Sequence, residues 1–227
     1  MNYERVLEDS FDYTKNVLWG RWLRWLQLMA CIVVFPLMYG YFVRIMQGDA
    51  PAPDPGGWGR LFLDGLKLLA VYLVYVGFML LVPAALMGGA GIAANGFVTA
   101  GVALVSFVLF ILIWLVVQMA AVRFAKAGSL REAFNIPAVL GQIHGIGWGP
   151  YILSQVILQI VLGFFVMFLA FSVVTVASLA GLVAGIMGFL LLPILLLAAS
   201  PPIYIFQYRY NTLVYESGGA GSGMSHP

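Results

Sequence analysis

Three glutamines within the apolar runs of this sequence are candidates for polar chemistry. Gln155 and Gln159 are four residues apart, so a helix places them on one face, and Gln118 lies in another apolar run. Such amides can line a polar pathway or can hydrogen-bond to a neighbouring helix. The sequence favours the second role, in which each bond contributes about 0.6 kcal/mol.

A small charged cluster is the next candidate for binding chemistry. Arg60, Asp64 and Lys67 are spaced so that they share one face of a helix. At the inner edge of a membrane-spanning helix, this face is suited to bind a lipid headgroup or a protein partner. The alternative, which we favour, is a surface ion-pair cluster that marks the membrane interface and contributes little to stability.

Two further features have structural interpretations. Gly181 and Gly185 form a GxxxG pattern, which is typical of close helix packing within a chain or in a dimer. His144 has no other ligand residue at metal-site spacing, so we expect a structural or solvent-facing histidine.

The motifs of common enzyme classes are missing from the sequence. There is no HExxH, no GxSxG, no glycine-rich phosphate loop and no cysteine cluster, and Cys31 is the single cysteine. Every Asp, Glu, Lys and Arg falls near the end of a predicted span, whereas ion-coupled transporters carry such residues near the midplane. We therefore expect no enzyme, no catalytic residue, no metal and no cofactor.

Composition identifies the class of protein. Of 227 residues, 63% are hydrophobic and 9% are charged, and the mean hydropathy is +0.99. Soluble domains carry about 25% charged residues, so this chain is an integral membrane protein rather than a soluble or disordered one. A net charge of +2 is too small to indicate a nucleic-acid partner.

Charged residues divide the apolar sequence into two long runs. No Asp, Glu, Lys or Arg occurs between Lys67 and Arg123, or between Glu132 and Arg209. A spanning helix needs about 20 apolar residues, so each run has room for two spans that form a hairpin. Turns at about 88–96 and 178–181 divide the runs. The predicted spans are about 61–87, 97–122, 149–176 and 180–208, and the two hairpins cover 61–122 and 149–208.

The apolar segment 22–47 has two interpretations. Pro36 and Gly40 interrupt it, which favours a broken helix. Cytoplasmic loops are enriched in Lys and Arg, and a re-entrant pair of half-helices keeps every basic flank inside. We favour this arrangement. It predicts a multi-pass protein of the cell membrane whose C-terminus is cytoplasmic. The alternative is a fifth span with an external N-terminus.

The remaining segments lie at the membrane surface or in loops. Residues 1–20 contain an amphipathic helix at 3–18, and 129–144 forms a second interfacial helix with Ser129 and Glu132 as its capping box. Interfacial tyrosines and tryptophans, Tyr208 and Tyr210 among them, form aromatic belts. The predicted organisation is all-α: one helical membrane domain over 1–216, with a Pro/Gly loop at 48–59 and a flexible tail at 217–227.

Several local motifs resemble one known family. They are the run from Phe35-Pro36 through Gly40-Tyr41 to Arg44, the Asp64-Gly65-Leu66-Lys67 element, Arg123-Phe124-Ala125, and Leu130-Arg131-Glu132-Ala133-Phe134. Together they resemble the prokaryotic, largely archaeal membrane proteins catalogued as domain of unknown function 4013. The resemblance covers about 21–212 and implies a polytopic membrane protein. It implies no activity, substrate or site residue.

Two functions fit these observations. The first is a non-enzymatic membrane subunit or scaffold that binds membrane lipids, other membrane subunits or itself. The second is a transporter or channel-like carrier of a neutral or lipidic substrate, which rests on the broken helices and on the Gly-Trp-Gly tripeptides at 57–59 and 147–149. An enzyme acting on lipids is the least favoured. A carrier should place Gln118, Gln155 and Gln159 around one cavity, whereas a scaffold should bury them between helices.

Overall fold

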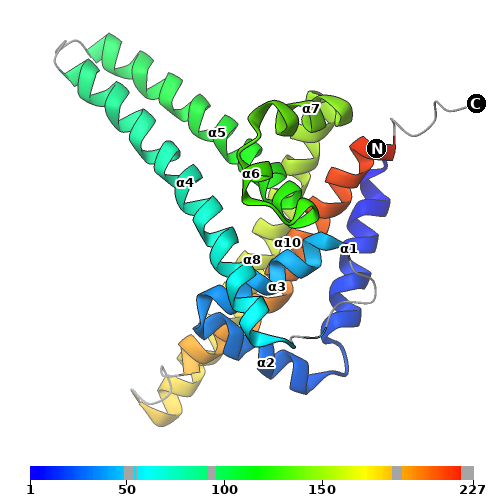
Figure 1. Ribbon diagram of the computed structural model, residues 1–227. Coiled ribbons are helices and arrows are strands. Elements are labelled where there is room, and N and C mark those ends of the chain that lie inside the picture. The colour runs from blue at the N-terminus through cyan, green and yellow to red at the C-terminus, as the bar shows by residue number, and fades with distance from the viewer. Residues whose placement is uncertain (49–53, 55, 92–95, 186–190, 221–227) are drawn as a thin grey trace, which may run out of the picture.

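All regular secondary structure in the described part of the chain is helical, as predicted. In the computed structural model the described residues are 1–48, 54, 56–91, 96–185 and 191–220, and they contain no strand (Figure 1). The helices are α1 (Tyr3–Leu18), α2 (Trp22–Val33), α3 (Phe35–Gln47), α4 (Trp58–Gly91), α5 (Gly96–Ala127), α6 (Leu130–Ala133), α7 (Ile136–Ile146), α8 (Trp148–Ala184) and α10 (Leu191–Ala220).

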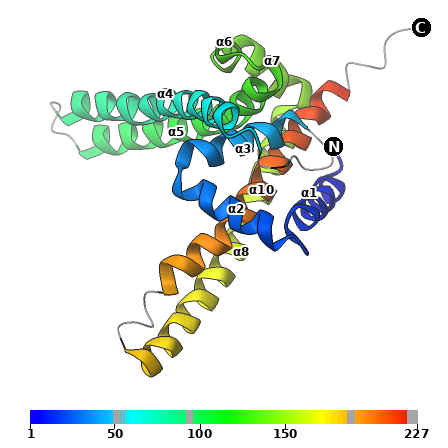
Figure 2. The same cartoon turned by 60° about the horizontal axis from the view of Figure 1, so that its bottom comes forward.

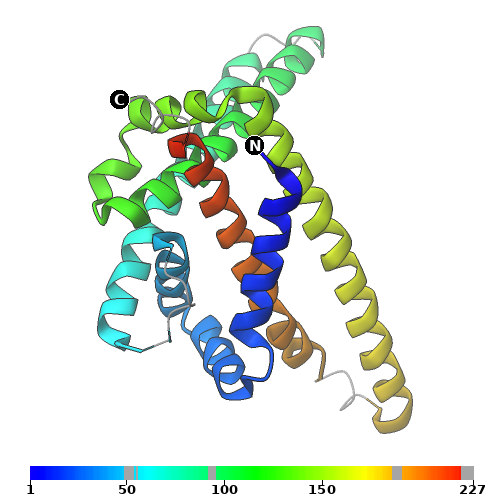
Figure 3. The same cartoon turned by 90° about the vertical axis from the view of Figure 1, so that its right-hand side faces the viewer.

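Two helical hairpins project from a shared base. Helices α4 and α5 form the first arm, and α8 with the N-terminal part of α10 forms the second. The ends of the arms lie far apart in all three views (Figures 1, 2 and 3). The other helices pack around the base.

The C-terminal half of α10 is the centre of this base. It contacts five other helices. Phe42 of α3 stacks on Tyr208, and Tyr13 of α1 lies under Arg209. Gln118 of α5 and Gln155 of α8 bond to Asn211, and Gln142 of α7 bonds to the Tyr215 carbonyl. Trp25 of α2 donates to the Ala198 carbonyl slightly earlier in α10. One helix therefore holds the first half of the chain against the second.

The arms expose apolar side chains far from the base. Phe107 on α5 is 61% exposed and Phe171 on α8 is 74% exposed. Three described helices are long and apolar enough to cross a membrane: Trp58–Gly88, Gly96–Ala127 and Trp148–Leu182. A helix that is apolar on all sides and not buried in protein needs lipid around it. These helices identify a membrane protein, and they cover the predicted spans 61–87, 97–122 and 149–176.

The second hairpin turns later than predicted. Helix α8 continues through residues 178–181 and ends at Ala184, followed by Gly185 with φ +62°. A positive φ at a glycine terminates helices. Gly181 is not among the glycines with positive φ, and it lies inside α8. Helix α10 is described from Leu191, so the span predicted at 180–208 is displaced, and α10 is not among the three long apolar helices.

Helix α10 also includes part of the predicted tail. Residues 217–220 are helical, and the Ser217 hydroxyl donates to the Val214 carbonyl. The hydroxyl of Ser217 also lies 3.4 Å from Sδ of Met1, so the N-terminus adjoins the end of α10. The predicted flexible tail at 217–227 is therefore wrong for 217–220, and 221–227 lies outside the described residues, as does most of the 48–59 loop.

The predicted break in 22–47 is present. Helix α2 ends at Val33, and Pro36 lies in the first turn of α3, where a missing N–H costs no intrahelical bond. The two helices have 12 and 13 residues, and neither reaches the about 20 residues that a span requires.

Glycines allow α3 and α4 to touch backbone to backbone. A Cβ on Gly40 would overlap the Leu61 carbonyl, and a Cβ on Gly65 would overlap the Pro36 carbonyl. Small residues at a helix interface permit this close approach. The motif residues Pro36, Gly40 and Gly65 thus form one contact.

Helix α1 has the predicted bounds, and the Asn2 side chain caps it by accepting from the Arg5 N–H at 3.2 Å. Part of its apolar face packs on protein: Val17 and Leu18 are buried, whereas Phe11 is exposed. Helix α1 runs beside α10 in Figure 3.

The predicted interfacial helix at 129–144 is two helices. The first helix ends at Ala133, with Phe134 as its C-cap. Asn135 caps the second by accepting from the Ala138 N–H, and Pro137 lies in the first turn of α7. Because proline has no N–H and its ring clashes with the carbonyl four residues earlier, a helix cannot run from α6 through Pro137. The predicted capping box is wrong, because the Ser129 side chain makes no cap bond and Glu132 pairs with Arg123 at 2.5 Å.

Candidate functional site

A ladder of three amides joins α5, α10 and α8. Asn211 donates from Nδ2 to Gln118 Oε1 at 3.0 Å, and Gln155 Nε2 donates to Asn211 Oδ1 at 3.0 Å. The three side chains are 1–7% exposed. Gln118 and Gln155 therefore brace helices, which is the role that the sequence favoured.

Buried hydroxyls reinforce the same junction. The Tyr151 hydroxyl donates to the Leu115 carbonyl at 2.6 Å and links α8 to α5. The Tyr210 hydroxyl donates to the Ser154 carbonyl at 2.9 Å and links α10 to α8. Each bond satisfies a phenol that would otherwise be buried without a partner. Tyr208 is also buried, so the prediction of an aromatic belt is wrong for Tyr208 and Tyr210.

Gln159 does not join the ladder. It is exposed and lies on the rim of a groove of 320 Å³ between α5 and α8, together with Gln155 and Trp114. Gln118 does not line this groove. Two of the three predicted glutamines therefore meet at this groove of the described residues, and Gln118 lies outside it.

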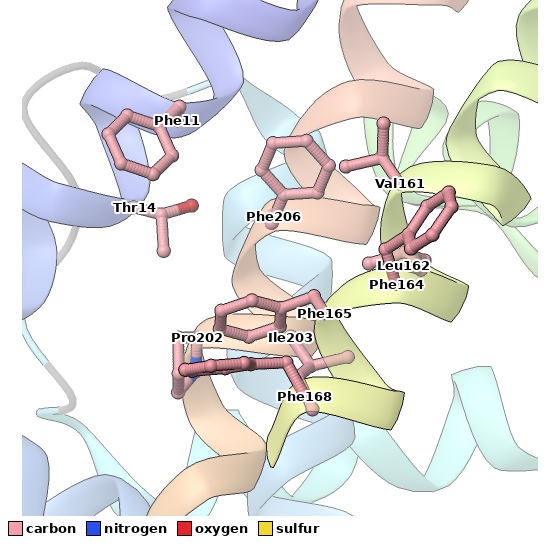
Figure 4. A pocket seen from close by; sticks show the side chains of 10 residues that line it. All are labelled: Phe11, Thr14, Val161, Leu162, Phe164, Phe165, Phe168, Pro202, Ile203 and Phe206. Atoms are coloured by element: carbon pink, nitrogen blue, oxygen red, sulfur yellow. The ribbon is translucent and has the colours of Figure 1, made fainter.

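A second groove is almost entirely apolar. It has a volume of 410 Å³, and Figure 4 shows its aromatic lining from α1, α8 and α10, including Phe11, Phe165, Phe168 and Phe206. The one hydroxyl in the lining, on Thr14, already donates to the Ser10 carbonyl at 2.8 Å. This groove offers contact with apolar chains and little polar selectivity.

The predicted charged cluster forms on the surface of α4. Asp64 lies 3.9 Å from Arg60 Nε and 3.2 Å from Lys67 Nζ, with the Arg60 side chain 89% exposed. Exposed pairs of this kind contribute about 0–1 kcal/mol. The cluster is thus the expected surface ion-pair group, and its binding of lipid or a partner remains a prediction.

Arginines also hold the entrance to α4. Arg44 donates to the carbonyls of Asp54 and Gly56 at 2.8 and 2.6 Å, and Arg24 bonds to the Asp54 carboxylate. The motif arginine of α3 therefore has a structural role, since it fixes the chain that leads into α4.

Two other predicted residues make no site. Gly185 follows the last residue of α8, and an added Cβ there would meet nothing within 4 Å among the described residues. Packing of Gly181 and Gly185, within the chain or in a dimer, stays a prediction. His144 is exposed on α7. Within the described residues, no group of three or more His, Cys, Asp or Glu side chains is placed to hold a metal ion.

The central amide of the ladder, Asn211, escaped the sequence analysis. It follows Arg209 and lies beyond the predicted span at 180–208, so it is not among the polar residues found inside predicted spans. The signal that could have found it is the helical pattern of α10, which continues past Arg209 with Tyr210 and Val214 both 0% exposed.

The two Gly-Trp-Gly tripeptides have the same local structure. Gly57 and Gly147 both have positive φ, +68° and +93°, and the tryptophan that follows each begins a long helix, α4 or α8. The sequence likeness therefore corresponds to equivalent positions at the start of each arm.

Comparison with known proteins supports the resemblance carried by the motifs. No curated protein and no solved structure matches the chain. The family model described as protein of unknown function (DUF4013) matches residues 25–176, which is most of the chain and includes the α3–α4 contact, Arg44 and the Arg123–Glu132 pair. The chain therefore belongs to this family of proteins of unknown function.

Proposed function

We propose that this protein is a non-enzymatic membrane subunit or scaffold that binds partners or lipids through its two apolar arms. The observation that carries the proposal is the contrast between base and arms. Polar side chains such as Gln118 and Asn211 are buried in the base and hydrogen-bond to each other there, whereas apolar side chains such as Phe107 and Phe171 are exposed on the arms. Large exposed apolar surface is typical of sites that contact lipid or protein.

The proposal includes a topology. Helix α10 forms the fourth span, and α2 and α3 form a re-entrant pair, so both termini lie in the cytoplasm. Support comes from a contact between the two end segments, in which Met1 adjoins Ser217. The Tyr3 hydroxyl also donates to the Pro150 carbonyl at 3.4 Å, which places the N-terminal helix beside the start of α8. An even number of crossings leaves both termini on one side, whereas a fifth span would separate them. Helix α1 then lies at the inner interface.

The arrangement of the glutamines favours this role over a carrier. A carrier needs polar groups around a shared path, and the three predicted glutamines do not surround one. The exposed apolar arms instead offer area for a membrane partner.

Native mass spectrometry of the protein extracted gently from its own membrane tests the proposal. We expect a stoichiometric protein partner, released by Phe107→Ala on α5 or by Phe171→Ala on α8. Both changes keep the arm apolar, so insertion is retained while packing against a partner is lost.

Phe35→Ala is the matched control, because Phe35 is 65% exposed but lies outside the arms. It should leave the complex intact. A lone protomer or homo-oligomer that carries a small molecule would contradict the subunit role and support a carrier.

A further inference from the structure

The groove between α5 and α8 has mostly apolar walls and one buried amide, Gln155, whose Nε2 has a hydrogen-bond partner and whose Oε1 has none. Ile111 and Trp114 of α5 face Gln155, Gln159 and Ile160 of α8 across a volume of 320 Å³. The lining contains no charged side chain. A ligand for this groove must therefore be neutral and mostly apolar.

The unused group is the carbonyl of Gln155. Its Nε2 donates to Asn211, but its Oε1 has no hydrogen-bond partner, and the residue is 1% exposed. A buried acceptor without a partner costs free energy comparable to a lost hydrogen bond. Because Gln155 lines the groove, a ligand whose O–H or N–H donor reaches this buried oxygen would satisfy it.

Gln159 supplies a complementary group one helical turn away. It is exposed at the groove, on a helix long and apolar enough to cross a membrane. Hydrocarbon provides no water to bond such an amide. Gln155 and Gln159 lie about 10 and 16 Å along α8 from Trp148, so Gln159 is near the middle of a hydrocarbon core about 30 Å thick.

We propose that this groove binds a neutral lipid that carries a hydroxyl group. The hydroxyl donates to Gln155 Oε1 and accepts from the Gln159 amide, and the chain lies against Ile111 and Ile160. This assignment deepens the proposed lipid-binding role and rests on it. It also gives Gln159 a function that bracing between helices does not.

Quenching of tryptophan fluorescence tests the site, because Trp114 lines it. The purified full chain in detergent micelles is titrated with 9,10-dibromooctadecan-1-ol and with its methyl ether, whose bromines quench on contact. Subtracting the quenching measured for the Trp114→Phe variant from that of the wild type leaves the quenching of Trp114 alone. The ether cannot donate a hydrogen bond, so we expect the alcohol to bind about three- to tenfold more tightly.

The Gln159→Leu variant tests the second contact without disturbing the ladder. It should weaken binding of the alcohol by about threefold or more, whereas Gln47→Leu, an exposed glutamine on α3, should not. Equal binding of alcohol and ether, or wild-type binding by Gln159→Leu, would overturn the proposal.

Conversion of a dimer to a monomer by Gln159→Leu, with no preference for the alcohol, would also overturn it and would assign the groove to a second copy of the chain. The subunit proposal is judged by the mass of the extracted complex. The two proposals can therefore fail separately.

Discussion

Two glycines set the distance between α3 and α4. Gly40 and Gly65 lie where carbonyl oxygens of the opposite helix occupy the space of a side chain, so neither position accepts a Cβ without backbone movement. The sequence motifs that identify the family include both residues. At the residue scale, these two motif glycines therefore act in packing.

The Gly65→Ala variant should be destabilised by about 1–3 kcal/mol, since its Cβ forces α3 and α4 apart. Gly77→Ala on the same helix is the control, because its Cβ would meet nothing within 4 Å, and it should be neutral or slightly stabilising. The measurement is the unfolding free energy of each variant in detergent. Equal stability of the two variants would contradict the close contact.

Which residues could be predicted from the sequence depended on whether their role is local. Pro36 ends a helix through its own geometry, so the break between α2 and α3 was predicted to within a few residues. Asn211 acts through Gln118 and Gln155, which are far away in sequence, and no local pattern reveals that pairing. Gly185 ends α8 through a positive φ that Gly181, an identical residue, does not adopt.

At the scale of elements, α1 joins the two ends of the chain. Its bounds followed from an amphipathic pattern, which is local. The surface that covers its apolar side was not predictable, because the same pattern fits lipid and protein equally well. In the structure Val17 and Leu18 are buried, and Arg209 of α10 lies 4.6 Å from the Tyr13 ring.

The Val17→Asp variant should detach α1 from α10, because it buries a carboxylate without a partner at a position that is 0% exposed. Hydrogen exchange of the backbone amides of residues 3–18 should then accelerate by at least tenfold. Glu8→Gln, on the exposed face of α1, is the control and should exchange at the wild-type rate. Slow exchange in Val17→Asp would show that lipid or detergent holds the helix.

At the scale of the whole molecule, the starts and ends of both arms gather at one base. Helices α4 and α8 leave it, and α5 and α10 return to it (Figure 1). The arrangement fits the proposal that both hairpins enter the membrane from one side. The hydrophobic pattern predicted the hairpins, but the divergence of the arms depends on packing at the base, which composition does not specify.

Labelling of a cysteine in α1 tests the resulting topology. In a Cys31→Ala background, Glu8→Cys should react with a membrane-impermeant maleimide only after the cells are permeabilised, since a re-entrant α2–α3 pair keeps the N-terminus inside. Arg131→Cys in the basic segment after α5 is the reference for an inside position. Labelling of Glu8→Cys in intact cells would favour five spans.

The divergence of the arms has a consequence for the bilayer itself. Arms that enter from one base and separate toward their ends occupy more lateral area in the far leaflet than in the near one. Because the arms meet at the base and their ends lie far apart, a bilayer that holds both arms must accept at least one of them tilted away from its normal.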